Sequence, residues 1–141
     1  MIIRLTTLSE NAACPGAFLA EWGLSILAEA GDTSVLLDTG QSISAAYNAD
    51  ILGIDLGRID KIVLSHGHYD HTGGLRSILR KMKKEIEIIA HPDVWAAKYR
   101  HRQQEYSYIG IPFQRQELES LGASFNLSKE PVKITDNIIT T

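Results

Sequence analysis

A short apolar strand that runs directly into a histidine-rich loop places the tightest limit on the fold of this chain. Residues 61–65, Lys-Ile-Val-Leu-Ser, have the length and apolar content of a buried central strand. The loop that follows begins at Ser65, the last residue of this strand. Its sequence over residues 65–74 is Ser-His-Gly-His-Tyr-Asp-His-Thr-Gly-Gly. Its polar side chains are therefore predicted to gather where a strand of the sheet ends.

This histidine loop (residues 65–74) has the chemistry of a metal site. It holds three of the five histidines of the chain, His66, His68 and His71, together with Asp70. Imidazole and carboxylate groups are standard zinc ligands, and imidazole also suits iron. Alternate residues that leave a strand point to the same side, so His66 and His68 are predicted to bind one ion. Asp70 and His71 then face a second ion, and the alternative is a surface turn that is histidine-rich by chance.

The rest of the chain alternates between strand and helix patterns. Strands are predicted at residues 2–8, 24–30, 33–38, 61–65, 87–90, 123–127, 132–135 and 138–141. Helices are predicted at residues 42–52, with Ser42 as the cap, and at 75–83, 92–98 and 114–121. Residues 99–112 are expected to form a long loop. The alternation indicates an α/β layered domain, and a length of 141 residues favours one domain over residues 1–141.

Composition narrows the expected partners and location. The net charge is −3, and the densest basic run, residues 80–84, is followed at once by Glu85 and Glu87, so no nucleic-acid partner is expected. No apolar run approaches the roughly 20 residues that a membrane-spanning helix needs. The N-terminus lacks the pattern of a secretion signal, and the single cysteine, Cys14, cannot form an internal disulfide. We therefore expect a cytoplasmic protein without a membrane partner.

The order His66-x-His68-x-Asp70-His71 after an apolar strand resembles the signature of the metallo-β-lactamase superfamily. Residues 20–25, 37–41, 52–56 and 63–75 together are similar to one branch of its metal-dependent hydrolases, which includes dihydropteridine–ribofuranosylaminobenzene phosphate synthases. The resemblance covers nearly the whole chain. It implies an αββα sandwich of which this chain is the N-terminal half, a mixed β-sheet with helices on one face.

The resemblance also assigns roles to individual residues. In that family the first two histidines hold one metal and the Asp-His pair holds a second, with zinc expected and iron or manganese as alternatives. It implies a hydrolase in which a metal-bound hydroxide attacks a small-molecule substrate that contains phosphate or a pterin. Asp70 is then both a ligand and the catalytic residue that orients the water. Asp38 resembles the buried family aspartate that braces the metal loop, with a simple turn residue as the alternative, and His91 is given a supporting role beside the ligands.

The chain departs from the family pattern in one respect. The complete site also uses a later histidine on each metal and usually a bridging aspartate, and Asp136 comes too early to be that bridge. Each ion would have two protein ligands here, whereas catalytic zinc usually has three, so activity is expected to need groups beyond this chain. Half a sandwich also leaves an apolar sheet face that needs a partner. The alternative to an active hydrolase is therefore an incomplete half-domain that forms a homo-oligomer or pairs with a separate C-terminal half.

Overall fold

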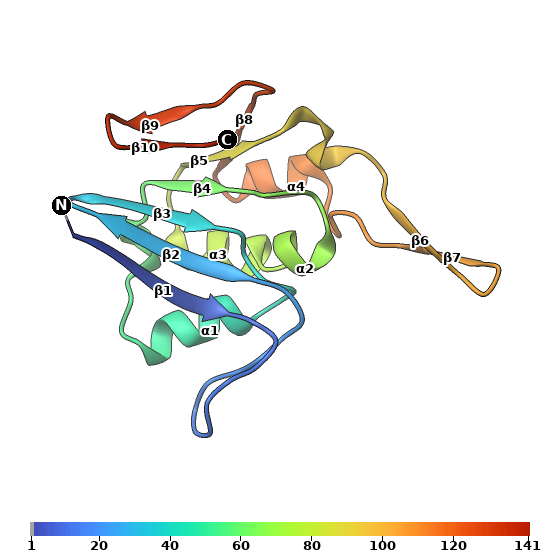
Figure 1. The fold of residues 1–141 in the computed structure, drawn as a ribbon, viewed down its shortest axis with the longest axis horizontal. Coiled ribbons are helices and arrows are strands. Elements are labelled where there is room, and N and C mark those ends of the chain that lie inside the picture. Colours follow the sequence, from blue (N-terminus) through green and yellow to red (C-terminus); the bar gives the residue numbers. More distant parts are fainter. Residues whose placement is uncertain (1) are drawn as a thin grey trace.

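A mixed six-stranded sheet, ordered β1-β2-β3-β4-β5-β8, is the centre of the computed structural model, which describes residues 2–141 (Figure 1). Its strands are β1 (Ile3–Ser9), β2 (Ser25–Ala30), β3 (Thr33–Leu37), β4 (Lys61–Val63), β5 (Ile86–Ala90) and β8 (Ala123–Leu127). The pairs β1·β2 and β2·β3 are antiparallel, whereas β3, β4, β5 and β8 are parallel neighbours. Parallel neighbours need crossover connections, and helices supply them here.

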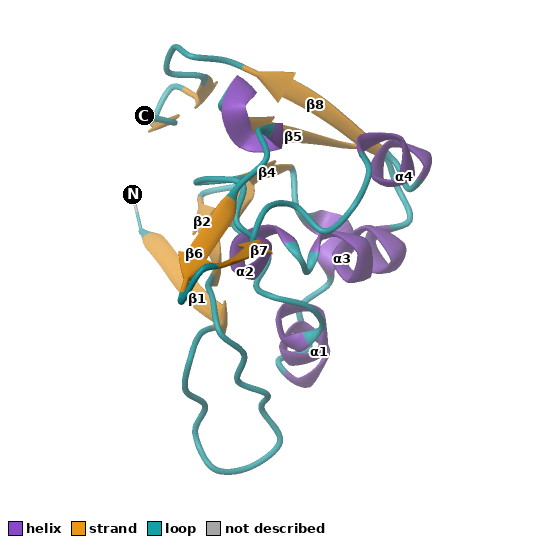
Figure 2. Cartoon of the chain, turned by 90° about the vertical axis from the view of Figure 1, so that its right-hand side faces the viewer, coloured by secondary structure: helices purple, strands orange, loops and turns teal. Residues whose placement is uncertain are grey.

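The helices α1 (Ser44–Ile51), α3 (Leu75–Met82) and α4 (Arg115–Ser120) lie on one face of this sheet (Figure 2). Leu36, Ile62 and Ile88 are aligned across the three central strands and are fully buried beneath these helices. Helix α3 buries an apolar stripe at helical spacing, made of Leu75, Ile78, Leu79 and Met82. These observations confirm the predicted α/β class with helices on one face. No helix within residues 2–141 combines the length and the apolar character that crossing a bilayer requires.

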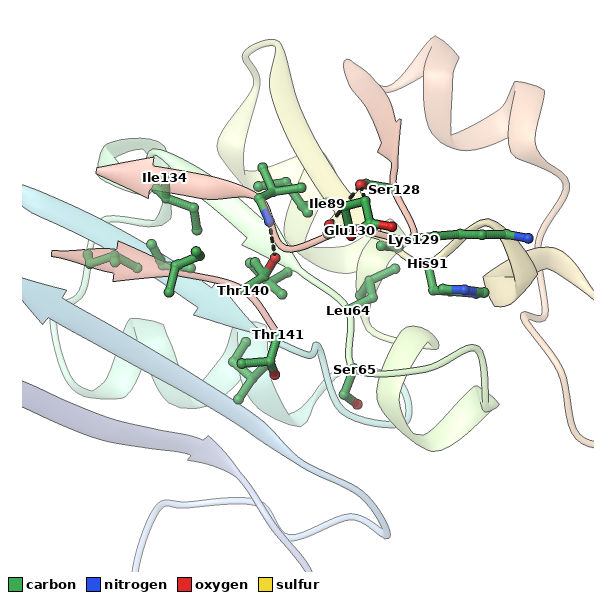
Figure 3. Close-up of a pocket in the computed structure, with 17 residues that line it drawn as sticks. Leu64, Ser65, Ile89, His91, Ser128, Lys129, Glu130, Ile134, Thr140 and Thr141 are labelled. Atoms are coloured by element: carbon green, nitrogen blue, oxygen red, sulfur yellow. Dashed lines mark hydrogen bonds between the residues drawn. The ribbon is translucent and has the colours of Figure 1, made fainter. Parts of the chain in front are cut away.

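The opposite face of the sheet is only partly covered. The hairpin of β9 (Lys133–Thr135) and β10 (Ile138–Ile139) lies over its central strands and encloses a cavity of about 440 Å³, whose lining includes Ile89 and Ile134 (Figure 3). Leu5 pairs with Ala28, which pairs with Val35, so the three side chains lie on this same face. Leu5 is nevertheless 66% exposed. The predicted uncovered apolar surface is therefore reduced to the β1 side of the sheet.

Residues 99–112 do not form the predicted long loop. β6 (Tyr99–Arg102) and β7 (Glu105–Tyr108) pair as an antiparallel hairpin that projects from the body and is called the ribbon below (Figure 1). One face of the ribbon carries four rings: Tyr99 packs edge-on against Tyr108, and His101 stacks on Tyr106. Its turn places Gln103 and Gln104 in the left-handed region, with φ of 46° and 69°. Glycine or asparagine normally marks such a turn, so two glutamines did not predict it.

Candidate metal centre

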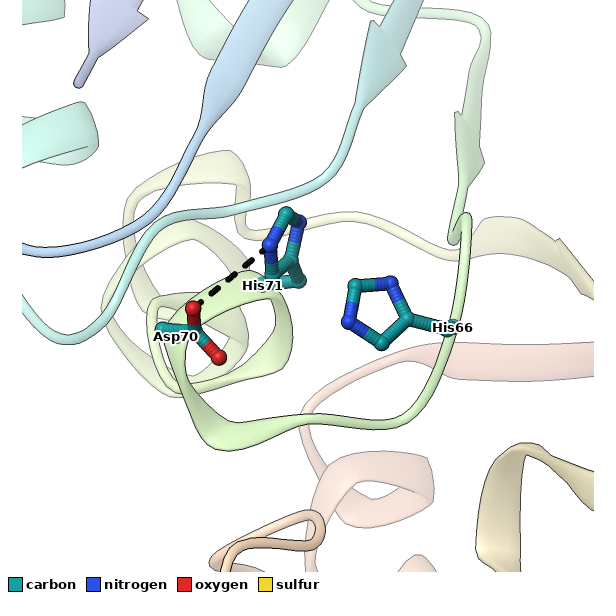
Figure 4. A group of neighbouring side chains, drawn as sticks. All are labelled: His66, Asp70 and His71. Carbon is teal, nitrogen blue, oxygen red and sulfur yellow. Dashed lines mark ion pairs between the residues drawn. The ribbon is translucent and has the colours of Figure 1, made fainter.

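The histidine loop leaves the carboxyl end of β4, at the edge of the sheet where the parallel strands end. It runs into a short helix, α2 (Tyr69–Thr72), which carries Asp70 and His71. Half-buried His66, Asp70 and His71 come together there, and one potential ligand atom from each lies within 4.8 Å of the others (Figure 4). The loop therefore brings residues from a strand end and a helix to one point.

The fourth predicted ligand, His68, lies against the same group. His68 Nδ1 is 3.0 Å from His66 Nε2, and His71 Nε2 is 3.6 Å from Asp70 Oδ2. The rings of His66 and His71 are 4.2 Å apart between centroids. The four side chains thus form one contiguous cluster, in which His66 contacts both His68 and His71, and the predicted division into two ligand pairs is not tested by these contacts. Their role as ligands stays a prediction.

Asp38 sits behind this cluster and is 1% exposed. Its Oδ1 accepts a hydrogen bond from Ser65 N at 2.8 Å, and its Oδ2 accepts from Ser65 Oγ at 2.6 Å and from His71 Nδ1 at 2.7 Å. Since the carboxylate can only accept, His71 carries its proton on Nδ1 and its Nε2 lone pair is free to bind a metal. Asp38 thereby fixes the orientation of His71.

Ser65 extends this arrangement to His66. The Ser65 hydroxyl gives its proton to Asp38, so its oxygen accepts from His66 Nδ1 at 2.9 Å. That proton position leaves His66 Nε2 unprotonated on the side that faces His68 and His71. One buried carboxylate therefore orients two histidines, directly for His71 and through a hydroxyl for His66.

This environment shifts the pKa values of His71 and His66 in opposite directions. The hydrogen bond to Asp38 raises the pKa of His71, helped by the charges of Asp38 and Asp70 and opposed by burial. Burial lowers the pKa of His66, and the neighbouring His71 and His68 lower it further. His66 is therefore held as a neutral imidazole, the form that binds a metal ion.

The backbone around the loop is packed too closely for larger residues at its glycines. A Cβ on Gly74 would lie 1.9 Å from Thr39 O, and a Cβ on Gly67 would lie 1.9 Å from Val94 O. Thr39 also donates to His71 O through its amide, at 2.8 Å, and through its hydroxyl, at 2.9 Å. These contacts fix α2 against the segment that follows β3.

The donor set fits a divalent metal. Imidazole nitrogens and a carboxylate oxygen are the ligands that zinc takes in catalytic sites. The donor atoms of His66, Asp70 and His71 lie within 4.8 Å of one another, near the spacing of ligands that each bind one ion at about 2 Å. Lone pairs of His66 Nε2 and His71 Nε2 converge on this space, because their Nδ1 protons are held elsewhere. We conclude that the residues present match a metal ion chemically.

Other candidate residues lie outside this group. His91 Nδ1 accepts from Asp93 N at 3.1 Å at the start of η2 (Pro92–Trp95), and His91 lines the cavity of Figure 3 together with Ser65. Its predicted supporting role beside the ligands stays a prediction. Asp136 lies in the β9–β10 turn and pairs with Lys133 at 2.6 Å, as expected for a turn residue.

The sequence analysis missed Glu21. The predicted cap Ser42 was wrong, because α1 begins at Ser44 and Ile43 at its cap position makes no side-chain capping bond. Instead Glu21 reaches from the β1–β2 connection and accepts from the amides and hydroxyls of Ser42 and Ser44. The segment 20–25 belonged to the family resemblance, but nothing in its spacing pointed to a helix that begins 23 residues after Glu21.

Comparisons with known proteins agree with this geometry. The sequence model of the metallo-beta-lactamase superfamily matches residues 23–138. The chain is 33% identical over 146 residues to 7,8-dihydropterin-6-methyl-4-(beta-D-ribofuranosyl)-aminobenzene-5'-phosphate synthase of Methanocaldococcus jannaschii, covering 98% of this chain and 49% of that protein. It is 37% identical over 123 residues to an uncharacterized protein of the same organism, covering 86% of this chain and 46% of that protein. The chain thus spans about half the length of these curated relatives.

Solved structures show the same fold. The metallo-beta-lactamase fold protein YhfI from Bacillus subtilis superposes with a TM-score of 0.57 at 17% identity, over 93% of this chain and 49% of that one. The Rm3 metallo-beta-lactamase superposes with a TM-score of 0.55 at 22% identity, over 82% of this chain and 43% of that one. Both matches cover about half of the larger protein, in agreement with a half-domain.

Proposed function

The chain belongs to the metallo-beta-lactamase superfamily, and from this premise we propose that it is the metal-binding half of a metal-dependent enzyme that acts on a small molecule. The observation that carries the proposal is the convergence of His66, Asp70 and His71 within 4.8 Å, with His68 against His66. When bound there, divalent metal ions supply Lewis acidity and lower the pKa of coordinated water.

Each residue has a proposed task. His66 Nε2 holds one ion together with His68, whose Nδ1 would give up the proton that it shares with His66. Asp70 with His71 Nε2 holds the second ion, and zinc is the proposed metal. Asp70 also orients water, because its carboxylate lies beside the ligand nitrogen of His71. Asp38 keeps the protons of His71 and, through Ser65, of His66 on the nitrogens that face away from the ions.

The proposed substrate carries a phosphate or a pterin ring. This class comes from the name of the relative that is 33% identical to the chain; that name combines a dihydropterin with a ribofuranosyl-aminobenzene phosphate. That relative is called a synthase. We propose hydrolysis for this chain's metal centre instead, because divalent ions in such a site would lower the pKa of coordinated water.

Metal content tests the proposal. Full-length chain, purified without an affinity metal or a chelator, should take up zinc in elemental analysis and titration calorimetry. His68→Ala should lose most of this binding, because it removes one of two ligands from an ion. His101→Ala is the matched control, since His101 lies exposed on the ribbon and should leave zinc uptake unchanged. Equal zinc uptake by His68→Ala and the unaltered chain would overturn the proposed centre.

A second candidate is favoured by the exposed sheet face. Ile3 and Leu5 of β1 are 59% and 66% exposed beside the covered part of the same face. An incomplete half-domain would use this face to dimerise or to bind a separate C-terminal half. Light scattering after gel filtration distinguishes these states: a dimer that Leu5→Arg converts to a monomer supports self-association, whereas a monomeric chain with full zinc uptake disfavours it.

A further inference from the structure

Lys98 is a partly buried lysine just before the ribbon, and its ammonium group lies among backbone carbonyls. Lys98 Nζ donates to Asp93 O at 2.9 Å, to Val94 O at 3.1 Å and to Ala96 O at 2.9 Å. These carbonyls lie at the end of η2, where the last carbonyls of a helix lack partners within the helix itself. An ammonium group has three protons, so the end of η2 uses the whole donor capacity of Lys98.

The same end of η2 packs against the backbone of the histidine loop. A Cβ on Gly67 would lie 1.9 Å from Val94 O and 2.9 Å from Lys98 Nζ. The Gly67 backbone therefore contacts a carbonyl and lies beside the ammonium group that holds this carbonyl. Gly67 separates the proposed ligands His66 and His68, so the position of Val94 O limits where the backbone of both histidines can lie.

The main chain of Lys98 reaches the histidine loop at a second point. Lys98 O accepts a hydrogen bond from Ile109 N at 2.8 Å, and Ile109 O accepts one from Tyr69 N at 3.0 Å. Tyr69 begins α2, the helix that carries the other two proposed ligands. Lys98 is thus linked to the loop on both sides of His68, at Gly67 through its side chain and at Tyr69 through its backbone.

We propose that Lys98 is a positioning residue of the metal centre. Its ammonium group fixes Val94 O against Gly67 and thereby sets the spacing of His66 and His68. This inference rests on the proposed function and adds to it a residue outside the histidine loop on which the affinity for the ion depends. Residues that orient metal ligands without binding the metal commonly contribute to the affinity in this way.

The number of donors distinguishes this role from the binding of a substrate anion. A lysine beside a metal site can hold a phosphate as a point charge. All three protons of Lys98 are directed at carbonyls, so contact with an anion would break a bond that closes η2. The geometry therefore favours support of the loop over contact with substrate.

Lys84 provides a matched comparison for a role in stability alone. It is also partly buried, and its Nζ donates to a backbone carbonyl, Ile59 O, at 2.6 Å. Residues 59 and 84 come just before β4 and β5, whereas the histidine loop follows the other end of β4. Lys84 thus holds a carbonyl at the edge of the sheet that is remote from the proposed ligands.

Zinc binding by variants of the full chain tests the role of Lys98. Lys98→Met keeps most of the side-chain length but removes the three hydrogen bonds, and it should raise the zinc Kd in titration calorimetry about tenfold. The visible absorption of bound cobalt(II), which depends on coordination geometry, should change as well. Lys84→Met should leave the Kd and the cobalt spectrum unaltered. Lys98→Arg keeps the charge, but its planar group cannot direct three protons from one nitrogen, so a rise of about threefold is expected.

The outcomes separate a positioning residue from a helix cap. Lys98→Met that unfolds at lower urea in chelator but keeps the zinc Kd and the cobalt spectrum overturns the proposal. Equal weakening of zinc binding by Lys84→Met also overturns it, because the loss would then follow general stability. If Lys98→Met does not fold, Lys98→Arg decides, and a Kd equal to that of the unaltered chain overturns the proposal. Failure of the unaltered chain to take up zinc is seen first and overturns the proposed function together with this inference.

Discussion

The histidine loop and the ribbon are joined by a hydrogen bond from Tyr69 N to Ile109 O, yet they are built in opposite ways. The loop is packed backbone against backbone at Gly67 and Gly74, and Asp38 beneath it is 1% exposed. All eight strand residues of the ribbon are exposed, and it projects from the body (Figure 1). The chain is therefore packed most tightly around the segment whose side chains must keep a fixed geometry.

The polar contacts of the loop are also more sensitive to substitution than those of the ribbon. Beneath the loop, the buried carboxylate of Asp38 accepts hydrogen bonds from three donors. Loss of any of these bonds leaves a buried oxygen without a partner, which is costly. On the ribbon, Arg100, Arg102 and Glu105 lie in solvent, where charged groups lose little when a neighbour is removed. Substitutions should therefore be costly in the loop and mild in the ribbon.

The largest effect is expected for Asp38→Asn. Asparagine tolerates the left-handed backbone of this position, φ 55°, so the change tests the carboxylate rather than the backbone. An amide cannot accept from all three donors of Asp38, because its NH2 group replaces one of the two accepting oxygens and then faces a donor. We expect a loss of about 1–3 kcal/mol in the free energy of unfolding and about 10- to 100-fold weaker zinc binding, measured by urea unfolding and calorimetry.

Asp60→Asn provides the control for that experiment. Asp60 also accepts a backbone hydrogen bond, from Ser34 N at 2.8 Å, but it is exposed and remote from the histidines. It should change the free energy of unfolding by less than about 0.5 kcal/mol and leave zinc binding intact. Equal effects of Asp38→Asn and Asp60→Asn would show that the buried carboxylate beneath the loop matters no more for stability and zinc binding than an exposed one.

An intermediate effect is expected from pH in the metal-free protein. The raised pKa of His71 stabilises the fold fully below the unfolded value of about 6.5, and this contribution is lost as the pH rises through the folded pKa. The lowered pKa of His66 acts in reverse: its penalty appears as the pH falls from about 6.5 toward the folded pKa. These two groups together predict greatest stability near pH 6.5.

Urea midpoints measured in chelator between about pH 5 and 8.5 check this dependence around the ordinary histidine value. His71→Gln should flatten the alkaline side of the profile, and His66→Gln should flatten the acid side. His101→Gln on the ribbon should leave the profile as it is. A profile that His71→Gln leaves unaltered would show that the hydrogen bond to Asp38 does not raise the pKa of His71, and a profile that His66→Gln leaves unaltered would show that burial does not lower the pKa of His66.

The smallest effect is expected on the ribbon. Tyr106→Ser should change the free energy of unfolding by less than about 0.5 kcal/mol, because the side chain is 73% exposed. Limited digestion with trypsin should cut after Arg102, next to the exposed turn, before it cuts the histidine loop. A large loss of stability in Tyr106→Ser, or a ribbon that resists trypsin, would mean that a partner covers this hairpin in solution.

The sequence predicted the parts of the molecule that depend on neighbours along the chain. The strand at residues 61–65 and the histidine loop were recognisable because a local pattern encodes both the strand end and the donor atoms. The turn at Gln103 and Gln104 was not, since neither residue is a usual one for the left-handed backbone it adopts. Stacking of His101 on Tyr106 and of Tyr99 on Tyr108 became visible only once the strands were paired.

Contacts between segments far apart in the sequence could not be predicted, for a different reason. Glu21 caps α1 across a separation of 21 to 23 residues, and Gly23 meets Asp70 across a still longer one. Such contacts are decided by how the elements pack and leave no periodic trace in the sequence. Asp38 was identified through the family resemblance, but its hydrogen bonds to Ser65 and His71 required coordinates.

The single oxygen Oδ2 of Asp38 accepts both from His71 and from the hydroxyl that serves His66. If the ions bind as proposed, the two positions share one brace and are thermodynamically linked. Because three donors already hold this carboxylate before an ion binds, neither ion would have to order it. Damage to this one oxygen would instead weaken both positions together, so a single buried atom would set the affinity of the whole centre.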